Sequence, residues 1–116
     1  MIEATVCEYL IHQNLPLIGG HVYLEVPVHP ESEYIVIEKT ASGEQNKIRS
    51  AMIAVQSISE TGLYTAAQMN ESVIEVMSNF ADNSAEIYSC KLNSDYNFTD
   101  PETKEYRYQA VFNIYY

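Results

Sequence analysis

The side chains that could perform acid–base or nucleophilic chemistry are few and widely separated in this sequence. The three histidines, His12, His21 and His29, fall at an expected helix end, at the start of an expected strand and in a proline-containing loop. Their spacing predicts no Ser-His-Asp or Cys-His arrangement, although such sites assemble only in space. Cys7 and Cys90 lie among regularly spaced apolar residues, where a buried and inert thiol is expected. We therefore predict no catalytic residue.

Metal and cofactor sites are not predicted either. A structural zinc site needs paired ligands such as C-x₂-C with H-x₃-H, and the sequence has no such pairs. Gly19 and Gly20 stand alone, without the remaining residues of a phosphate-binding loop. Asp95, Asn97 and Asp100 superficially resemble a calcium loop, but the central glycine and the final glutamate of such a loop are missing. The sequence thus predicts no metal and no cofactor.

Two other features need an explanation. Asn70 lies within the apolar stripe of a predicted helix, where an unpaired amide is costly. Its amide either caps nearby backbone groups or meets a neighbouring subunit. Six of the ten tyrosines fall between Tyr88 and Tyr116, and tyrosine, with its apolar ring and polar tip, is enriched in protein–protein contacts. These rings either form a contact surface or cover the helices.

Arg107 stands between Tyr106 and Tyr108 on the last predicted strand and is one of only six basic residues. Its planar guanidinium suits ion pairs and aromatic stacking. One interpretation is an ion pair with a neighbouring strand of the same chain. The other is an interface between subunits, for which Tyr106, Arg107, Tyr108 and Asn70 are the candidate residues.

Length and charge narrow the classes of function. The 116 residues predict a single domain, residues 1–116. Sixteen acidic residues against six basic ones give a formal net charge of −10, which repels DNA and anionic membranes. No apolar run approaches the ~20 residues that span a bilayer, and the acidic N-terminal segment lacks the basic start of a signal peptide. We expect a protein that stays in the cytosol at synthesis and binds neither nucleic acid nor membranes.

Hydrophobic periodicity predicts the elements of the first two-thirds of the chain. Helical spacing predicts a helix over residues 2–13, which ends before Pro16. Alternating or β-branched residues predict strands over 21–26, 34–41 and 48–58, with the polar residues 42–47 as a hairpin loop. From residue 63 to residue 80 the period becomes helical again. On this helix the residues predicted to pack onto the sheet are Val73, Ile74 and Met77.

A second hairpin is predicted at the C-terminal end of the sequence. Asp100 and Pro101 fit a type I turn between its strands. Before the turn, one parity is shared by Tyr88, Cys90, Leu92, Tyr96 and Phe98. After the turn, one face carries Tyr106, Tyr108, Ala110, Phe112, Ile114 and Tyr116. The order α-β-β-β-α-β-β predicts an α+β fold, an antiparallel β-sheet with two helices on one face.

Several stretches of the sequence point to a known family. Two near the C-terminus are the most specific: LNSDYNFTD, from Leu92 to Asp100, and YRYQAVF, from Tyr106 to Phe112. The stretches VYLEVP, YIVIEKT and AVQS, ahead of the long helix, are more generic strand sequences. Through these features the chain resembles the prophage-encoded tail-completion, or tail-terminator, proteins of long-tailed bacteriophages. The likeness spans nearly the whole chain.

The resemblance implies an α+β subunit that assembles as a homo-oligomeric ring, commonly a hexamer, at the head-proximal end of the tail tube. Such a ring stops tube polymerisation and joins tail to head. The expected partners are therefore the tail-tube protein and the head-completion or neck proteins. The expected location is the neck region of the virion tail, after assembly in the host cytoplasm. Proteins of this family are not enzymes, so the resemblance supplies no catalytic residue.

Two other classes of function stay open on the residues alone. A small cytosolic α+β ligand-binding domain or enzyme would have a deep pocket containing two titratable groups with shifted pKa values. An acidic adaptor that mimics DNA would have a continuous acidic stripe on its folded surface.

Overall fold

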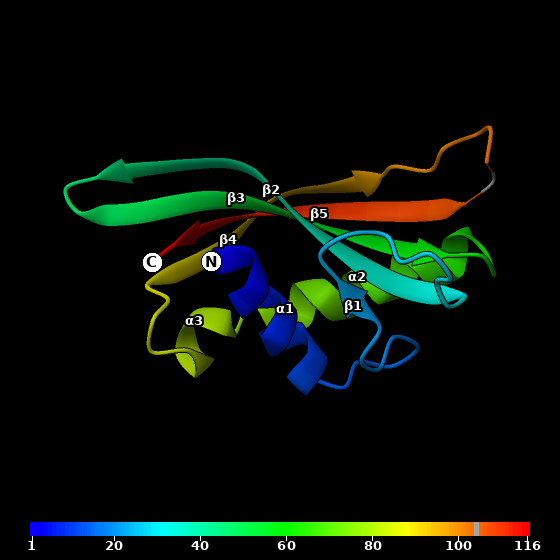
Figure 1. Ribbon diagram of the computed structural model, residues 1–116, viewed down its shortest axis with the longest axis horizontal. Helices are drawn as coiled ribbons and strands as arrows, with labels where there is room; N and C mark the ends of the chain where they lie inside the picture. Colours follow the sequence, from blue (N-terminus) through cyan, green and yellow to red (C-terminus); the bar gives the residue numbers. More distant parts are fainter. Residues whose placement is uncertain (104) are drawn as a thin grey trace.

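The computed structural model describes residues 1–103 and 105–116, and in them five strands form one sheet with the order β1-β2-β3-β5-β4 (Figure 1). The strands are β1 (Val22–Tyr23), β2 (Glu33–Gln45), β3 (Ile48–Ser59), β4 (Ser89–Asn97) and β5 (Tyr106–Tyr115). The helices are α1 (Ile2–His12), α2 (Leu63–Met77) and α3 (Phe80–Asn83). The predicted α+β class and element order are confirmed, with a short third helix added after α2.

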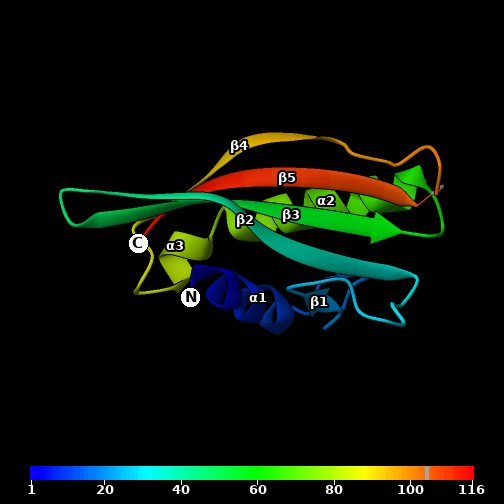
Figure 2. The same cartoon turned by 45° about the horizontal axis from the view of Figure 1, so that its top comes forward.

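The helices lie on one face of the sheet, as the side view in Figure 2 shows. α1 packs against β1 and β2, whereas α2 packs against β3 and β5. The helix faces that meet the sheet are apolar, and so is this face of the sheet. Packing them together removes both surfaces from water. The largest cluster of buried side chains lies between them and includes Val6, Leu10, Ile35, Ile53, Val55, Met69, Val73, Phe112 and Ile114. The opposite face of the sheet carries no helix, and we call it the helix-free face.

The predicted antiparallel sheet is confirmed except at one edge. β2–β3, β3–β5 and β4–β5 are antiparallel pairs, but β1 runs parallel to β2 and pairs with it only at Ile35 and Val36. The strand predicted over residues 21–26 is therefore only Val22–Tyr23. Beyond it, Leu24 and Val26 are 42% and 59% exposed, because the chain leaves the sheet before they can join the core.

The loop predicted over residues 42–47 is also wrong, because β2 continues through it to Gln45. Only Asn46 and Lys47 form the turn, with φ angles of 53° and 66°. Positive φ at both central residues is the geometry of a two-residue hairpin turn that matches the twist of its strands. The polar residues that suggested a loop instead form strands that face water.

β4 contains a bulge that changes the predicted parity of its side chains. Its register shifts between Leu92 and Ser94. Directly opposed residues of an antiparallel pair share a face, and Leu92 opposes the buried Phe112, whereas Tyr96 opposes Gln109 on the helix-free face. The five residues predicted to share one face are therefore divided: Cys90 and Leu92 face the helices, while Tyr96 faces away from them.

The second helix differs from its prediction in length and in orientation. The periodic stretch over residues 63–80 breaks after Met77, and α3 begins at Phe80. Val73 and Met77 are fully buried, as predicted. Ile74 is only partly buried at the margin of the core, and Met69 takes a fully buried position instead. The helix is thus rotated slightly from the predicted face.

Candidate assembly surface

The turn between β4 and β5 is built by short polar side chains that bind the backbone. The Asn97 side-chain oxygen accepts hydrogen bonds from the Thr99 backbone nitrogen and hydroxyl, at 3.0 and 2.6 Å. Asp100 accepts one from the backbone nitrogen of Glu102 at 2.9 Å. Asp and Asn favour such turns because their side chains replace backbone partners. The predicted turn at Asp100 and Pro101 thus ends the hairpin next to Arg107.

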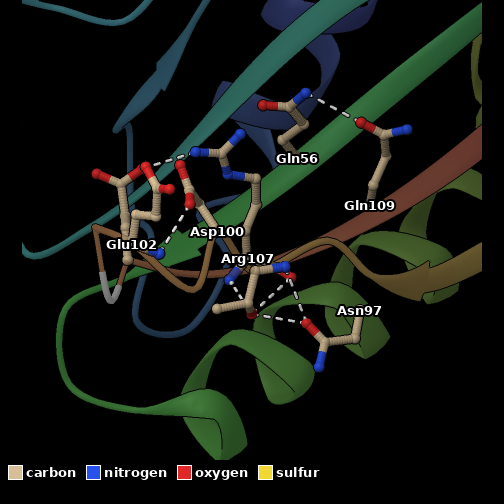
Figure 3. Close-up of polar contacts among 8 residues, drawn as sticks. Gln56, Asn97, Asp100, Glu102, Arg107 and Gln109 are labelled. Carbon is tan, nitrogen blue, oxygen red and sulfur yellow. Dashed lines mark hydrogen bonds and ion pairs between the residues drawn. The ribbon is translucent and has the colours of Figure 1, made fainter.

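Arg107 makes its ion pair inside the chain. Its guanidinium donates to Glu105 at 3.0 Å and lies 5.7 Å from the centre of the Phe98 ring. The partner is two residues earlier in the chain, not on a neighbouring strand as one interpretation expected. Figure 3 shows Arg107 extending toward the turn that carries Asp100 and Glu102. The side chain remains 22% exposed, and its Nε has no hydrogen-bond partner among the described residues.

The structure does not bring the other predicted interface residues onto the surface that holds Arg107. Tyr108 opposes Ser57, which in turn opposes the buried Ile35, so Tyr106 and Tyr108 lie on the helix side of the sheet. Arg107 lies on the helix-free face, as strand alternation requires. Both tyrosines are partly buried. The three adjacent residues therefore contribute to two different surfaces.

Asn70 has a partner that neither interpretation of the sequence named. The side chain is 1% exposed, and its nitrogen donates to the Asp95 carboxylate on β4 at 3.0 Å. Its oxygen has no hydrogen-bond partner among the described residues. A contribution of Asn70 to a subunit contact stays a prediction.

A row of polar side chains crosses the helix-free face and was not predicted. The Gln56 amide donates to the Gln109 oxygen at 3.0 Å, and the Gln109 amide donates to the Tyr96 hydroxyl at 2.6 Å. Gln56 and Gln109 lie on neighbouring strands and point toward one another in Figure 3. The strand register brings the three side chains together, and the sequence alone does not show that register.

The titratable groups with shifted pKa values offer no reactive side chain. Burial raises the pKa of the Cys90 thiol to about 12. The pKa of Cys7 is also raised, mainly by burial and secondly by the charge of Glu8, and its sulfur donates to the Val22 carbonyl. Thiols with raised pKa values stay protonated at neutral pH and are poor nucleophiles.

A second titratable pair lies beside β1. The Tyr23 hydroxyl is 2.8 Å from both carboxylate oxygens of Glu31, and this hydrogen bond lowers the pKa of Glu31 and raises that of Tyr23. An open hollow is lined by Cys7, Tyr23 and residues 24–28. The thiol and the phenol both have raised pKa values, so neither of these two groups is a nucleophile or a base at neutral pH.

Neither a metal cluster nor a spanning helix is present in the part of the chain that the structure describes. No group of three or more His, Cys, Asp or Glu side chains there could hold a metal ion. Within the same residues, no helix has the length and apolar character that crossing a membrane requires.

Comparison with known proteins connects this fold to a virus-like particle. No protein-family model and no curated protein matches the chain. A chain in the solved structure of the virion of a native gene transfer agent particle is similar over 97% of this chain and 84% of its own length, with a TM-score of 0.65. The two chains share a fold. Their sequence identity is 15%, so the function of the virion chain is carried over only as a proposal.

Proposed function

We propose that this protein is a structural subunit of a phage-like virion, where it forms a ring that caps the tail tube and helps to join the tail to the head. The observation that carries the proposal is the likeness over 97% of the chain to a chain of the gene transfer agent virion. The resemblance of residues 92–100 and 106–112 to tail-completion proteins supports the finer assignment to the neck region. On this proposal the protein is not an enzyme.

The proposed partners follow from that assignment. Copies of the same chain form the ring, the tail-tube protein binds one side of it, and a head-completion or neck protein binds the other. The hairpin that carries Arg107 supplies one side of a contact between two different patches on adjacent copies. Contacts of this kind form rings when the rotation between subunits closes. Tyr106, Tyr108 and Asn70 are proposed to support this hairpin from the helix side of the sheet.

The proposal is tested by adding the purified protein to polymerising tail-tube protein from the same genome. Electron microscopy should show a ring at one end of each tube, and tubes should become shorter as more protein is added. The protein without tubes is followed by sedimentation at increasing concentration. Failure to form rings in both experiments, with tube lengths unchanged, would show that the proposed function is wrong.

Neither alternative class has a specific observation in its favour. The hollow beside β1 contains two groups with shifted pKa values, as a ligand-binding domain or enzyme would, but both groups are held protonated. A DNA mimic would carry a continuous acidic stripe, whereas Lys39, Lys47 and Arg49 place basic side chains at one end of this sheet.

A further inference from the structure

The hairpin formed by β2 and β3 projects beyond the helices at one end of the sheet (Figures 1 and 2). Every residue from 38 to 49 is exposed, and we call this segment the hairpin arm. Within the described residues β1 pairs with β2 only at Ile35 and Val36, so the outer edge of the arm has no strand partner. A protruding hairpin with an open edge is a preferred site for contact with another chain.

The arm is positive on a molecule that is otherwise strongly negative. It contains three basic residues, Lys39, Lys47 and Arg49, and two acidic residues, Glu38 and Glu44, for a formal charge of +1. The remaining three basic and fourteen acidic residues give the rest of the chain −11. Complementary charges at two sites favour association of one copy with another.

The helix-free face of the arm also offers apolar surface. Two adjoining hollows there are lined by residues that include Gly43, Ile48, Ser50, Met52 and Tyr115. Ile48 and Tyr115 are 45% and 44% exposed. Lys39 and Arg49 lie on the other face of the arm, since Lys39 opposes the buried Ile53 and Arg49 stacks on Tyr116. The arm thus offers apolar surface on one face and basic side chains on the other and at its tip. A surface of this kind suits a partner that is both apolar and acidic.

The opposite end of the sheet carries both acidic and exposed aromatic side chains. Figure 1 shows the connection from β3 to α2 and the turn between β4 and β5 together at that end, with the arm at the other. The connection contributes Glu60. The first turn of α2 contributes Tyr64, which is 76% exposed. The turn between β4 and β5 contributes Glu102 and the nearby Phe98, which is 44% exposed. We call these four residues the acidic end.

We infer that the hairpin arm of one copy docks onto the acidic end of the next copy. The inference rests on the proposed ring. The acidic end includes the turn beside Arg107, which the proposed function already places on one side of the contact between copies. The hairpin arm is then the other side of that contact. The occupant is a second copy because the acidic and apolar surface that complements the arm belongs to this same chain. Joining two different ends leaves one arm and one acidic end free, so association continues until the ring closes.

The test compares two variants with the same change in charge. Lys47 lies at the tip of the arm, whereas Lys91 is an exposed lysine on β4 outside it. In sedimentation velocity over a concentration series, Lys47→Glu should weaken self-association about tenfold, because a repulsion replaces an attraction across the contact. Lys91→Glu should change it less than about twofold. Added salt should weaken association of the unmodified protein, since it screens exposed charges.

A charge exchange then tests the proposed acceptor. Glu60→Lys and Glu102→Lys, introduced together with Lys47→Glu, should restore assembly, while circular dichroism confirms that every variant is folded. Equal weakening by Lys47→Glu and Lys91→Glu, or no recovery in the exchanged variant, would show that the arm does not bind the acidic end. Rings of the unmodified protein would still support the proposed function in that case. An unmodified protein that stays monomeric, even on tail tubes, overturns both.

Discussion

Asn70 and Asp95 join the central helix to the edge of the sheet. The Asn70 side chain on α2 donates a 3.0 Å hydrogen bond to the carboxylate of Asp95 on β4. Asn70 is almost completely buried, whereas Asp95 lies on an exposed part of the edge strand. An amide inside an apolar stripe thus gains a charged partner, which offsets the cost of removing it from water.

Removal of this amide should therefore destabilise the protein. Asn70→Ala should lower the free energy of unfolding by about 1–3 kcal/mol, because the hydrogen bond and the buried side chain are lost together. Urea unfolding measures the change. Gln68→Ala, on an exposed position of the same helix, is the control and should change the free energy by less than about 0.5 kcal/mol. Equal effects of the two substitutions would contradict a structural role for the pair.

The rotation of α2 gives a second prediction. Met69→Ala should cost about 2–5 kcal/mol of unfolding free energy, because Met69 is fully buried between the helix and the sheet. Ile74→Ala should cost less than half as much, because Ile74 is only partly buried at the margin of the core. The same unfolding measurement compares them, and a larger loss for Ile74→Ala would mean that the helix faces the sheet as the sequence pattern predicted.

The hydrogen bond from Tyr23 to Glu31 predicts a dependence on pH. Tyr23→Phe removes the hydroxyl that holds the Glu31 pKa below its ordinary value, so this pKa should rise toward that ordinary value. A carboxyl whose pKa is lower in the folded state stabilises the protein above its unfolded pKa and loses that contribution as the pH falls through the folded value. The variant should therefore be less stable than the unmodified protein near neutral pH, with the difference shrinking in acid.

NMR titration of the Glu31 carboxyl and unfolding at several pH values measure these effects. Tyr64→Phe is the matched control, because Tyr64 is 76% exposed and should leave the Glu31 pKa unchanged. An unchanged Glu31 pKa in Tyr23→Phe would show that another group lowers it.

Metal removal should have no effect on stability. Neither the sequence spacing nor the described residues supply a set of ligands for a structural ion. The temperature of half-unfolding should therefore be the same with and without a chelator, as measured by circular dichroism. A clear decrease on chelation would show that a bound ion had been missed.

We expect Arg107, on the hairpin of β4 and β5, to be required for ring assembly. Arg107→Glu should prevent ring formation in sedimentation while circular dichroism stays that of a folded protein, because it removes the guanidinium that packs against Phe98 of the acidic end. Loss of that packing should outweigh the added negative charge. Because Arg107 pairs with Glu105, the substitution also breaks an internal ion pair. Glu105→Gln breaks the same pair without reversing Arg107 and should still permit rings. Rings formed by Arg107→Glu at the same concentration as the unmodified protein would show that Arg107 has no part in assembly.

The sequence by itself determined the class and order of the main elements and, for β5, the face that is buried. Helical periodicity placed α1 and most of α2, and the alternation along residues 106–116 predicted the core face of β5. These features are local: each depends on neighbours within a few residues and on the fixed repeats of a helix or a strand. For the same reason the alternation placed Arg107 on the polar face of its strand.

The tertiary structure alone decided the relationships between distant segments. The bulge after Leu92 turned Tyr96 toward Gln109, and the turn at Asn46 and Lys47 extended the arm, although neither has a strong signal in the sequence. The pairing of Asn70 with Asp95 and the separation of the basic arm from the acidic end depend on strand order and register. Those are set by packing across the whole sheet, because a one-residue shift in pairing would turn every side chain of a strand to the other face.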